Sequence, residues 1–362
     1  MSDTPVLEAK GLCKTYKVSG ENSLFAKTFS AVKDVSFAVY PGETFGIVGE
    51  SGCGKSTVAK LLMCLEKPTT GEVYFQGQRT DDLPEARRRA LRPRFQMVFQ
   101  DSGSSLNPRK RVGDILREPM QYHFASLDRK DSYKAEEPSC GFLGKGPGEN
   151  RSMASKERFS PEKNSFLDAR VEELLSLVGL PAEMKNRYPH EFSGGQRQRI
   201  CIAKALSLNP DVIVLDEPVS ALDVSVQAQI LNLLRDLQEK LNLTYLFIGH
   251  GLGAVHYLSS RIAVMYRGRV VEMGGADALF DHPAHPYTRA LLDAAPVADY
   301  ALRGRNRVSL SGEVDEEPPA GACPLYARCP YKTEDCLRFQ GEMTAVPSDE
   351  THLSVCHRAW ED

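Results

Sequence analysis

Short, almost wholly apolar runs recur along the chain and predict buried strands. A run of four or five such residues is typical of a parallel strand that is covered on both faces. A further set of apolar residues, which predicts one half-buried strand, precedes Pro41-Gly42. The apolar runs are Phe45 to Val48, Val212 to Leu215 and Thr244 to Ile248, and the half-buried set is Val32, Val35, Phe37 and Val39.

Helical spacing of apolar residues separates these strands, which predicts the α/β class. It covers Val58 to Leu65, a stripe within residues 101–192 made of Val171, Leu174, Leu175, Leu177 and Val178, and the segment around Tyr287 to Leu292. Two segments lack such a pattern. Residues 24–30 are a predicted loop, and residues 127–165, rich in Ser, Lys, Glu and Gly, are a predicted flexible surface insertion.

Charge and hydropathy narrow the possible partners. The net charge of −3 over 362 residues gives no electrostatic footprint for nucleic acid. The longest uncharged stretch, Leu241 to Ser260, contains histidines and glycines, so it predicts a strand, a turn and a short helix rather than a membrane span. The first residues, Met1 to Pro5, lack a basic and apolar leader, and we expect a cytosolic protein that reaches a membrane only through a partner.

The most specific motif is Gly49-Glu50-Ser51-Gly52-Cys53-Gly54-Lys55-Ser56-Thr57, between a predicted strand and a predicted helix. In that setting G-x-x-x-x-G-K-[ST] predicts a phosphate-binding loop. Its glycines let backbone N–H groups point at phosphate oxygens, and the following helix adds its dipole. Lys55 supplies a positive charge for the terminal phosphates, and the Ser56 hydroxyl can ligate Mg²⁺.

Two carboxylates, Asp216 and Glu217, directly follow the apolar run that begins at Val212. They stand at the carboxyl end of a predicted parallel strand, where open α/β sheets bind ligands. Asp216 can hold the hydration shell of Mg²⁺, and Glu217 can accept a proton from an attacking water. An Asp-Glu-Pro that merely ends a strand does not explain this pair in a chain with a phosphate loop.

A second anion site is predicted at Ser193-Gly194-Gly195-Gln196, ahead of a helical pattern. Ser193 is a favourable N-cap, and the glycines leave backbone N–H groups bare. One nucleotide does not need two such sites, so each site is expected to serve the nucleotide of a different chain.

Taken together, these motifs resemble the ATPase subunits of ABC transporters over roughly residues 5–295. The resemblance implies a P-loop ATPase cassette in residues 1–295, with a RecA-like core and an antiparallel β-subdomain. It also implies a helical subdomain at about residues 101–192 that docks on membrane proteins. A small Cys-containing extension, residues 296–362, follows the cassette.

The same resemblance implies roles for individual residues. The Walker A residues that bind ATP are Gly49, Ser51, Gly52, Gly54, Lys55, Ser56 and Thr57, and the signature that closes over ATP held by the partner is Ser193, Gly194, Gly195 and Gln196. Glu217 is the expected base, aided by His250 at the γ-phosphate and by Lys55; Ser56, Gln100 and Asp216 are the expected Mg²⁺ ligands. Asp223 belongs to the D-loop, and Tyr16 is expected to stack on adenine.

Two positions depart from the family pattern. Gly251 follows His250 where the family has Asp, and Ser102 follows Asp101 where the peptide-transporter branch has Pro. Neither change removes a ligand or the base, so hydrolysis is still expected.

Four further segments resemble the oligopeptide and dipeptide importer branch, and within it the second, F-type ATPase of the pair. They are Ser105 to Arg109, Tyr188 to Phe192, Val224 to Gln229 and His285 to Thr288. The resemblance implies two permease subunits, a paralogous second ATPase that makes a heterodimer, and an extracytoplasmic binding protein. It also implies a peripheral position on the cytoplasmic side of the inner membrane. Nickel, glutathione, antimicrobial-peptide and sugar-oligomer systems share the branch, so the cargo stays open.

A function outside transport is the alternative: a regulatory or nucleic-acid-associated ABC ATPase. Such proteins need zinc modules, long coiled coils or two cassettes in one chain. This sequence has one cassette, no sustained heptads and an intact Asp216-Glu217 pair, which favours the importer.

Four cysteines fall within the last forty residues: Cys323, Cys329, Cys336 and Cys356. In a reducing cytosol they are not expected to form disulfides, and their spacing is not that of paired zinc-ribbon cysteines. Four thiolates suit a [4Fe–4S] cluster. The segment also resembles the C-terminal extension of peptide-importer ATPases, and the resemblance implies such a cluster because some of these extensions carry one. A zinc site that uses His357, and four free thiols, are the alternatives.

Overall fold

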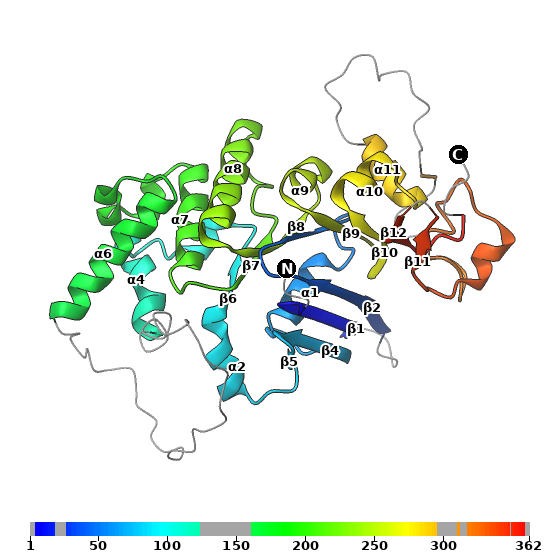
Figure 1. Cartoon of the computed structure of the whole chain (residues 1–362), viewed down its shortest axis with the longest axis horizontal. Helices are drawn as coiled ribbons and strands as arrows, with labels where there is room; N and C mark the ends of the chain where they lie inside the picture. Colours follow the sequence, from blue (N-terminus) through cyan, green and yellow to red (C-terminus); the bar gives the residue numbers. More distant parts are fainter. Residues whose placement is uncertain are drawn as a thin grey trace. The chain divides into compact units, whose positions relative to one another are not determined.

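The computed structural model describes residues 4–18, 27–123, 161–294, 310–311, 317–347 and 349–358. Its contacts divide the chain into two compact units, one of residues 1–101 with 211–362 and one of residues 102–210 (Figure 1). Most of the predicted insertion at 127–165 lies outside the described residues. Residues 161–165, which the sequence placed in that insertion, instead form the start of a helix.

The first unit contains a four-stranded antiparallel sheet in the order β2-β1-β4-β5. Its strands are β1 (Leu7–Val18), β2 (Lys27–Val39), β4 (Thr70–Phe75) and β5 (Gln78–Arg79). The predicted loop at 24–30 is wrong from Lys27 onward, because these residues pair with β1, for example Phe29 with Tyr16. Val32 and Val35 both point inward although three positions separate them. Asp34 has a left-handed φ of 55° between them, and the register with β1 shifts there.

The second sheet has eight strands in the order β11-β12-β10-β9-β3-β8-β7-β6. The run from β9 to β6 is parallel, while β10, β11 and β12 pair antiparallel with their neighbours. The strands are β3 (Thr44–Val48), β6 (Phe95–Val98), β7 (Val212–Asp216), β8 (Thr244–Gly249), β9 (Arg261–Tyr266), β10 (Arg269–Gly275), β11 (Thr344–Val346) and β12 (Asp349–Ser354). The C-terminal extension therefore continues the main sheet through β12, which was not predicted.

Helices complete both units. The first unit holds α1 (Lys55–Leu62), α2 (Glu85–Leu91), α8 (Val224–Leu241), α9 (Leu252–Leu258), α10 (Ala276–Asp281) and α11 (Pro286–Ala294), with the 3₁₀ turns η1 (Arg92–Arg94) and η6 (Glu334–Arg338). The second unit holds α3 (Ser102–Ser105), α4 (Val112–Tyr122), α6 (Pro161–Leu177) and α7 (Gly194–Leu206), with η3 (Ala182–Asn186) and η4 (Pro189–Glu191). In α6 the predicted stripe packs inward, since Val171, Leu174 and Leu175 are fully buried. Among the described residues, no helix combines the length and the apolar character needed to cross a bilayer.

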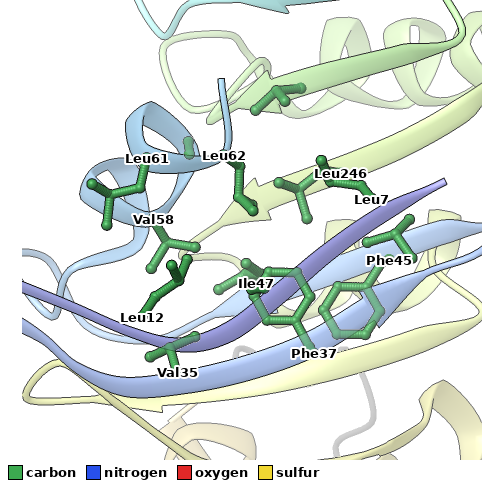
Figure 2. Close-up of a cluster of buried hydrophobic side chains, with 14 of the residues drawn as sticks. Leu7, Leu12, Val35, Phe37, Phe45, Ile47, Val58, Leu61, Leu62 and Leu246 are labelled. Carbon is green, nitrogen blue, oxygen red and sulfur yellow. The ribbon is translucent and has the colours of Figure 1, made fainter. Parts of the chain in front are cut away.

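The core of the first unit lies where β1, β2, β3 and α1 meet (Figure 2). Phe37 of β2 stacks on Phe45 of β3 with ring centroids 4.9 Å apart. Leu61 and Leu62 bury the inner face of α1 against the strands. The phosphate loop joins β3, which is fully buried, to α1, whose inner face is buried, and this anchors both ends of the loop.

Candidate active site

The loop between β3 and α1 has a backbone that only glycine can adopt at two positions. At Gly54, φ is +109°, and a Cβ atom there would lie 2.4 Å from the Ala31 carbonyl oxygen. A Cβ atom on Gly49 would lie 2.2 Å from the Met265 carbonyl oxygen. Ser51 and Gly52 are exposed in the same loop. The chain therefore passes close to its neighbours and turns directly into α1, whose N-terminus attracts anions.

Lys55, the first residue of α1, folds back over this loop. Its Nζ donates to the Gly49 carbonyl oxygen at 2.7 Å and to the Glu50 carbonyl oxygen at 2.9 Å. The residue is only 4% exposed. Its positive charge is thus fixed inside the loop, where it can attract phosphate oxygens.

Ser56 and Asp216 meet across the site. Ser56 Oγ donates to Asp216 Oδ1 at 3.1 Å. Burial raises the pKa of the Asp216 carboxyl; the Ser56 hydrogen bond lowers it, and the neighbouring charge of Glu217 raises it further. Their juxtaposed oxygens are the hard-ligand chemistry that Mg²⁺ prefers.

Two further predicted residues contact the Glu217 carboxylate. The Gln100 amide donates from Nε2 to Glu217 Oε2 at 2.8 Å, and His250 Nδ1 lies 3.3 Å from the same oxygen. Glu217 follows β7 and His250 follows β8, and these strands pair in parallel, so their carboxyl ends bring the two side chains together. Glu217 also has a left-handed φ of 47°, and its N–H donates to the Ile248 carbonyl oxygen at 2.9 Å.

Tyr16 lies on β1 close to α1. Its hydroxyl donates to Glu66 Oε2 at 2.6 Å and also contacts the Thr57 side chain. Burial raises the pKa of Tyr16, and the Glu66 hydrogen bond adds to that rise. The cross-strand neighbour Phe29 is 54% exposed, and an exposed aromatic beside Tyr16 is a second stacking candidate that the sequence did not single out.

Asp223 is exposed and stands at the N-terminus of α8, in the segment predicted to be the D-loop. Its carbonyl oxygen accepts from the N–H groups of Val226 and Gln227. Upstream, Ser220 Oγ donates to the Glu217 carbonyl oxygen at 3.0 Å. The D-loop is therefore tied through Ser220 to the backbone of the expected base.

The predicted signature lies in the second unit and begins α7. Ser193 and Gln196 form a capping box: Gln196 N–H donates to Ser193 Oγ at 3.3 Å, and Ser193 N–H donates to Gln196 Oε1 at 3.0 Å. Gly194 and Gly195 form the first turn without side chains. The N-terminus of this thirteen-residue helix is thus open to an anion.

Two residues that touch the phosphate loop were not predicted as site residues. The Glu50 N–H donates to Tyr287 Oη at 2.8 Å, and the Arg328 guanidinium lies 3.2 Å from Glu50 Oε2. The sequence singled out Tyr287 only as part of a branch motif, and it offered no signal that either residue reaches the loop.

The four C-terminal cysteines line one pocket of about 410 Å³, together with aromatic residues such as Tyr326 and Tyr331. Burial raises the pKa of Cys323 to about 12 and that of Cys356 to about 11, and the neighbouring sulfurs add to both rises. The thiols of Cys323 and Cys356 are therefore protonated at neutral pH. Within the described ranges, no group of three or more His, Cys, Asp or Glu residues is placed so that it could hold a metal ion.

Comparison with protein families gives two matches. The family described as ABC transporter matches residues 32–220, and the family described as oligopeptide/dipeptide transporter, C-terminal region, matches residues 271–336. The first match includes the phosphate loop, the signature and the carboxylate pair. The second includes the segment that carries Tyr287, Arg328 and three of the four cysteines.

Individual relatives agree with these families. The oligopeptide transport ATP-binding protein AppF of Bacillus subtilis is 43% identical, over 97% of this chain and 97% of its own length. The dipeptide transport ATP-binding protein DppF of Escherichia coli is 42% identical, over 94% and 91%. The solved dimeric structure of the ATP-binding cassette MJ0796 with ADP and Pi is 28% identical and covers 75% of this chain and 98% of its own. Its TM-score is 0.57.

Proposed function

We propose, from the premise that this chain belongs to the family of ABC transporter ATP-binding subunits, that it powers the import of di- or oligopeptides or similar solutes. ATP binding and hydrolysis follow from the family, and the expected α/β cassette fold is confirmed. The cargo is the proposal. It is supported by the relatives, which are named for transport of oligopeptides, dipeptides and glutathione.

For nucleotide binding, we assign the triphosphate to the loop from Gly49 to Thr57. Lys55 and the N-terminus of α1 attract its oxygens, and Tyr16 stacks on the base. Ser56, Gln100 and Asp216 would hold Mg²⁺, which supplies neutralisation of phosphate charge when bound. The contact between Ser56 Oγ and Asp216 Oδ1 supports this ligand set, and Gln100 keeps its Oε1 for the ion because its Nε2 faces Glu217.

For hydrolysis, we assign the base to Glu217. Gln100 and His250 both contact Oε2, so Oε1 can accept a proton from water. That water attacks the γ-phosphorus while the bond to the bridging oxygen of ADP breaks, giving ADP and phosphate. During this attack His250 orients the γ-phosphate, and Lys55 stabilises the charge spread over the transferred group.

The observation that carries this assignment is the convergence of Gln100 and His250, which come from two separate segments, on one carboxylate oxygen of Glu217. We further propose that Ser193 to Gln196 closes over the nucleotide of a second, paralogous ATPase subunit. ATP bound from both sides then favours the closed dimer, and loss of phosphate lets it reopen.

The family implies membrane permease partners. In finer detail we propose two permeases, an extracytoplasmic binding protein and a peripheral position on the cytoplasmic face. Affinity purification of the tagged full chain from detergent-solubilised membranes tests this: two hydrophobic permeases and a second ATPase should co-purify in stoichiometric amounts. Recovery with nucleic acid or with soluble partners alone would favour the alternative of a non-transport ABC ATPase.

For the four cysteines we propose a [4Fe–4S] cluster, supported by their convergence on one pocket. As placed, they form no metal-binding group, so the site would have to tighten around its occupant. Anaerobic purification should give brown protein containing iron and acid-labile sulfide, and Cys336→Ser should lose both while Cys64→Ser, outside the pocket, keeps them. Stoichiometric zinc, or colourless metal-free protein, would refute the cluster.

A further inference from the structure

One residue of the phosphate loop, Glu50, is held at three separate points. Its carbonyl oxygen accepts from Lys55 Nζ at 2.9 Å, and its N–H donates to Tyr287 Oη at 2.8 Å. Its carboxylate faces the Arg328 guanidinium: Nη1 lies 3.2 Å from Oε2 and 3.4 Å from Oε1, and Nη2 lies 3.4 Å from Oε1. Two of the three holds therefore come from residues more than two hundred positions along the chain.

The position of Glu50 creates an electrostatic problem. Its backbone is one hydrogen bond from Lys55, the cation assigned to the triphosphate, so its side-chain carboxylate lies in the same small region. A negative charge there repels phosphate, and at a separation of about 8 Å the repulsion corresponds to about a 2- to 30-fold loss of affinity for effective dielectric constants of roughly 80 to 20. A loop that binds a highly charged anion therefore needs this carboxylate neutralised.

Arg328 is built to do this rather than to form an adjustable surface pair. It is 8% exposed and lies in the turn that runs from Leu325 to Cys329, where its N–H donates to the Leu325 carbonyl oxygen at 2.9 Å. Its Nη1 also lies 3.3 Å from Tyr266 Oη. The Tyr266 ring packs on that of Tyr287 with centroids 4.6 Å apart. Tyr266 therefore contacts both residues that bind Glu50, Arg328 and Tyr287.

We infer that Arg328 is a positioning residue for nucleotide binding, which neutralises the Glu50 carboxylate and keeps it away from the phosphates. The C-terminal extension thereby becomes part of the ATP-binding machinery rather than an appendage. This inference rests on the proposed placement of the triphosphate in the loop from Gly49 to Thr57.

The test is the affinity of the purified full chain for a fluorescent, ribose-labelled ATP analogue, with ATP as competitor. Arg328→Met removes the charge at similar volume and should weaken binding about 3- to 30-fold, while Arg328→Lys, which keeps the charge but not the two-pronged contact, should recover part of the loss. Glu50→Gln should bind at least as tightly as wild type, because it removes the repelling charge. Arg338→Met, an exposed arginine of the same extension, is the matched control and should bind normally.

The dependence of binding on ionic strength distinguishes an effect of the Arg328 charge from an effect of its packing. The defect of Arg328→Met should shrink as salt rises from about 0.01 M to about 1 M, because the Debye length falls from about 30 Å to about 3 Å. In the Glu50→Gln background, Arg328→Met should weaken binding far less than it does in wild type.

Several outcomes would overturn the inference. They are normal affinity in folded Arg328→Met, a salt-independent defect, or a Glu50→Gln variant that loses as much affinity as Arg328→Met. Should Arg328→Met fail to fold, Glu50→Gln and Arg328→Lys still decide, since a purely structural ion pair predicts weaker binding for Glu50→Gln. Absence of binding by the wild-type chain would instead count against the proposed function itself.

Discussion

Gln100 and Glu217 are 117 positions apart in sequence, yet the amide nitrogen of Gln100 lies 2.8 Å from Oε2 of Glu217. The glutamine follows β6 and the glutamate follows β7, which are neighbours in the parallel sheet. The family resemblance implies that Gln100 also senses the membrane domains, which would put that sensor in direct contact with the residue expected to activate water. Movement of Gln100 would change the orientation of the base, which is a short route from docking to hydrolysis.

Replacement of the base should separate hydrolysis from binding. Glu217→Gln should lower ATP turnover by about 10²- to 10⁴-fold, the usual contribution of a positioned base, because an amide cannot accept the proton of water. Nucleotide should still bind, since the phosphate loop is unchanged. Phosphate release under saturating ATP and analogue binding measure the two effects.

The matched control is Glu239→Gln, an exposed carboxylate on α8. It should leave turnover unchanged. Near-normal phosphate release by Glu217→Gln would show that the base is misassigned.

The raised pKa of Asp216 gives a prediction about the nucleotide-free protein. Burial, together with the charge of Glu217, makes the folded state hold this proton more tightly than the unfolded chain does. The stabilisation is therefore complete below the ordinary pKa of an aspartate, about 4, and is lost as the pH rises through the raised value. At neutral pH the ionised, buried Asp216 carboxylate therefore lowers the stability of the wild-type fold when no cation is bound.

Asp216→Asn should consequently be more stable than wild type in EDTA at about pH 7, and the advantage should shrink toward about pH 4 as the wild-type carboxyl is protonated. Thermal unfolding across this range measures it, with the exposed Asp236→Asn as control. A variant less stable than wild type at neutral pH would contradict the assigned direction. The same variant should lose the extra stabilisation that Mg²⁺ with ATP gives to wild type.

Local patterns accounted for the parts of the site that depend on neighbouring residues. The loop at Gly49 to Thr57 and the carboxylates after β7 were recognisable because each occupies one continuous segment with a motif of its own. The pair Glu50 and Arg328 was not, because 278 positions separate the two residues and neither belongs to a motif that implies the other. The pairing of β12 with β10 was missed for a similar reason: β12 is short, mostly polar, and pairs with a distant strand.

The junction between β10 and β12 contains a fully buried carboxylate, that of Glu272. It accepts from the N–H groups of Ala284 and His285 at 2.7 and 2.9 Å, and His352 Nε2 lies 2.7 Å away. Removing one donor from a buried acceptor leaves part of its desolvation uncompensated, which costs about 1–3 kcal/mol.

We therefore expect His352→Ala to lower the free energy of unfolding by about 1–3 kcal/mol in chemical denaturation. His352→Gln, which keeps an N–H donor, should lose less. Glu350→Ala, exposed on the same strand, should change little. Equal losses for the Ala and Gln variants would show that packing rather than the hydrogen bond matters, since His352 also packs against Gly274.

Gly251, the position where the family has Asp, is the N-cap of α9 and has no side chain to cap the helix. Its φ of −87° suits any residue, and a Cβ atom there would meet nothing within 4 Å. An aspartate can therefore be accommodated, can accept from N–H groups of the first turn of α9, and can place a negative charge at the positive end of the helix dipole. Gly251→Asp should raise the free energy of unfolding by about 0.3–1 kcal/mol.

Gly251→Ala is the control, because it adds the same Cβ and loses the same backbone freedom without the capping oxygen. The difference between the two variants isolates the cap and should shrink in high salt, which screens the dipole term. Chemical denaturation of both variants measures it. An aspartate variant no more stable than the alanine variant would mean that the first turn of α9 already satisfies its N–H groups, and that the family's residue at this position serves the neighbouring His250 rather than the helix.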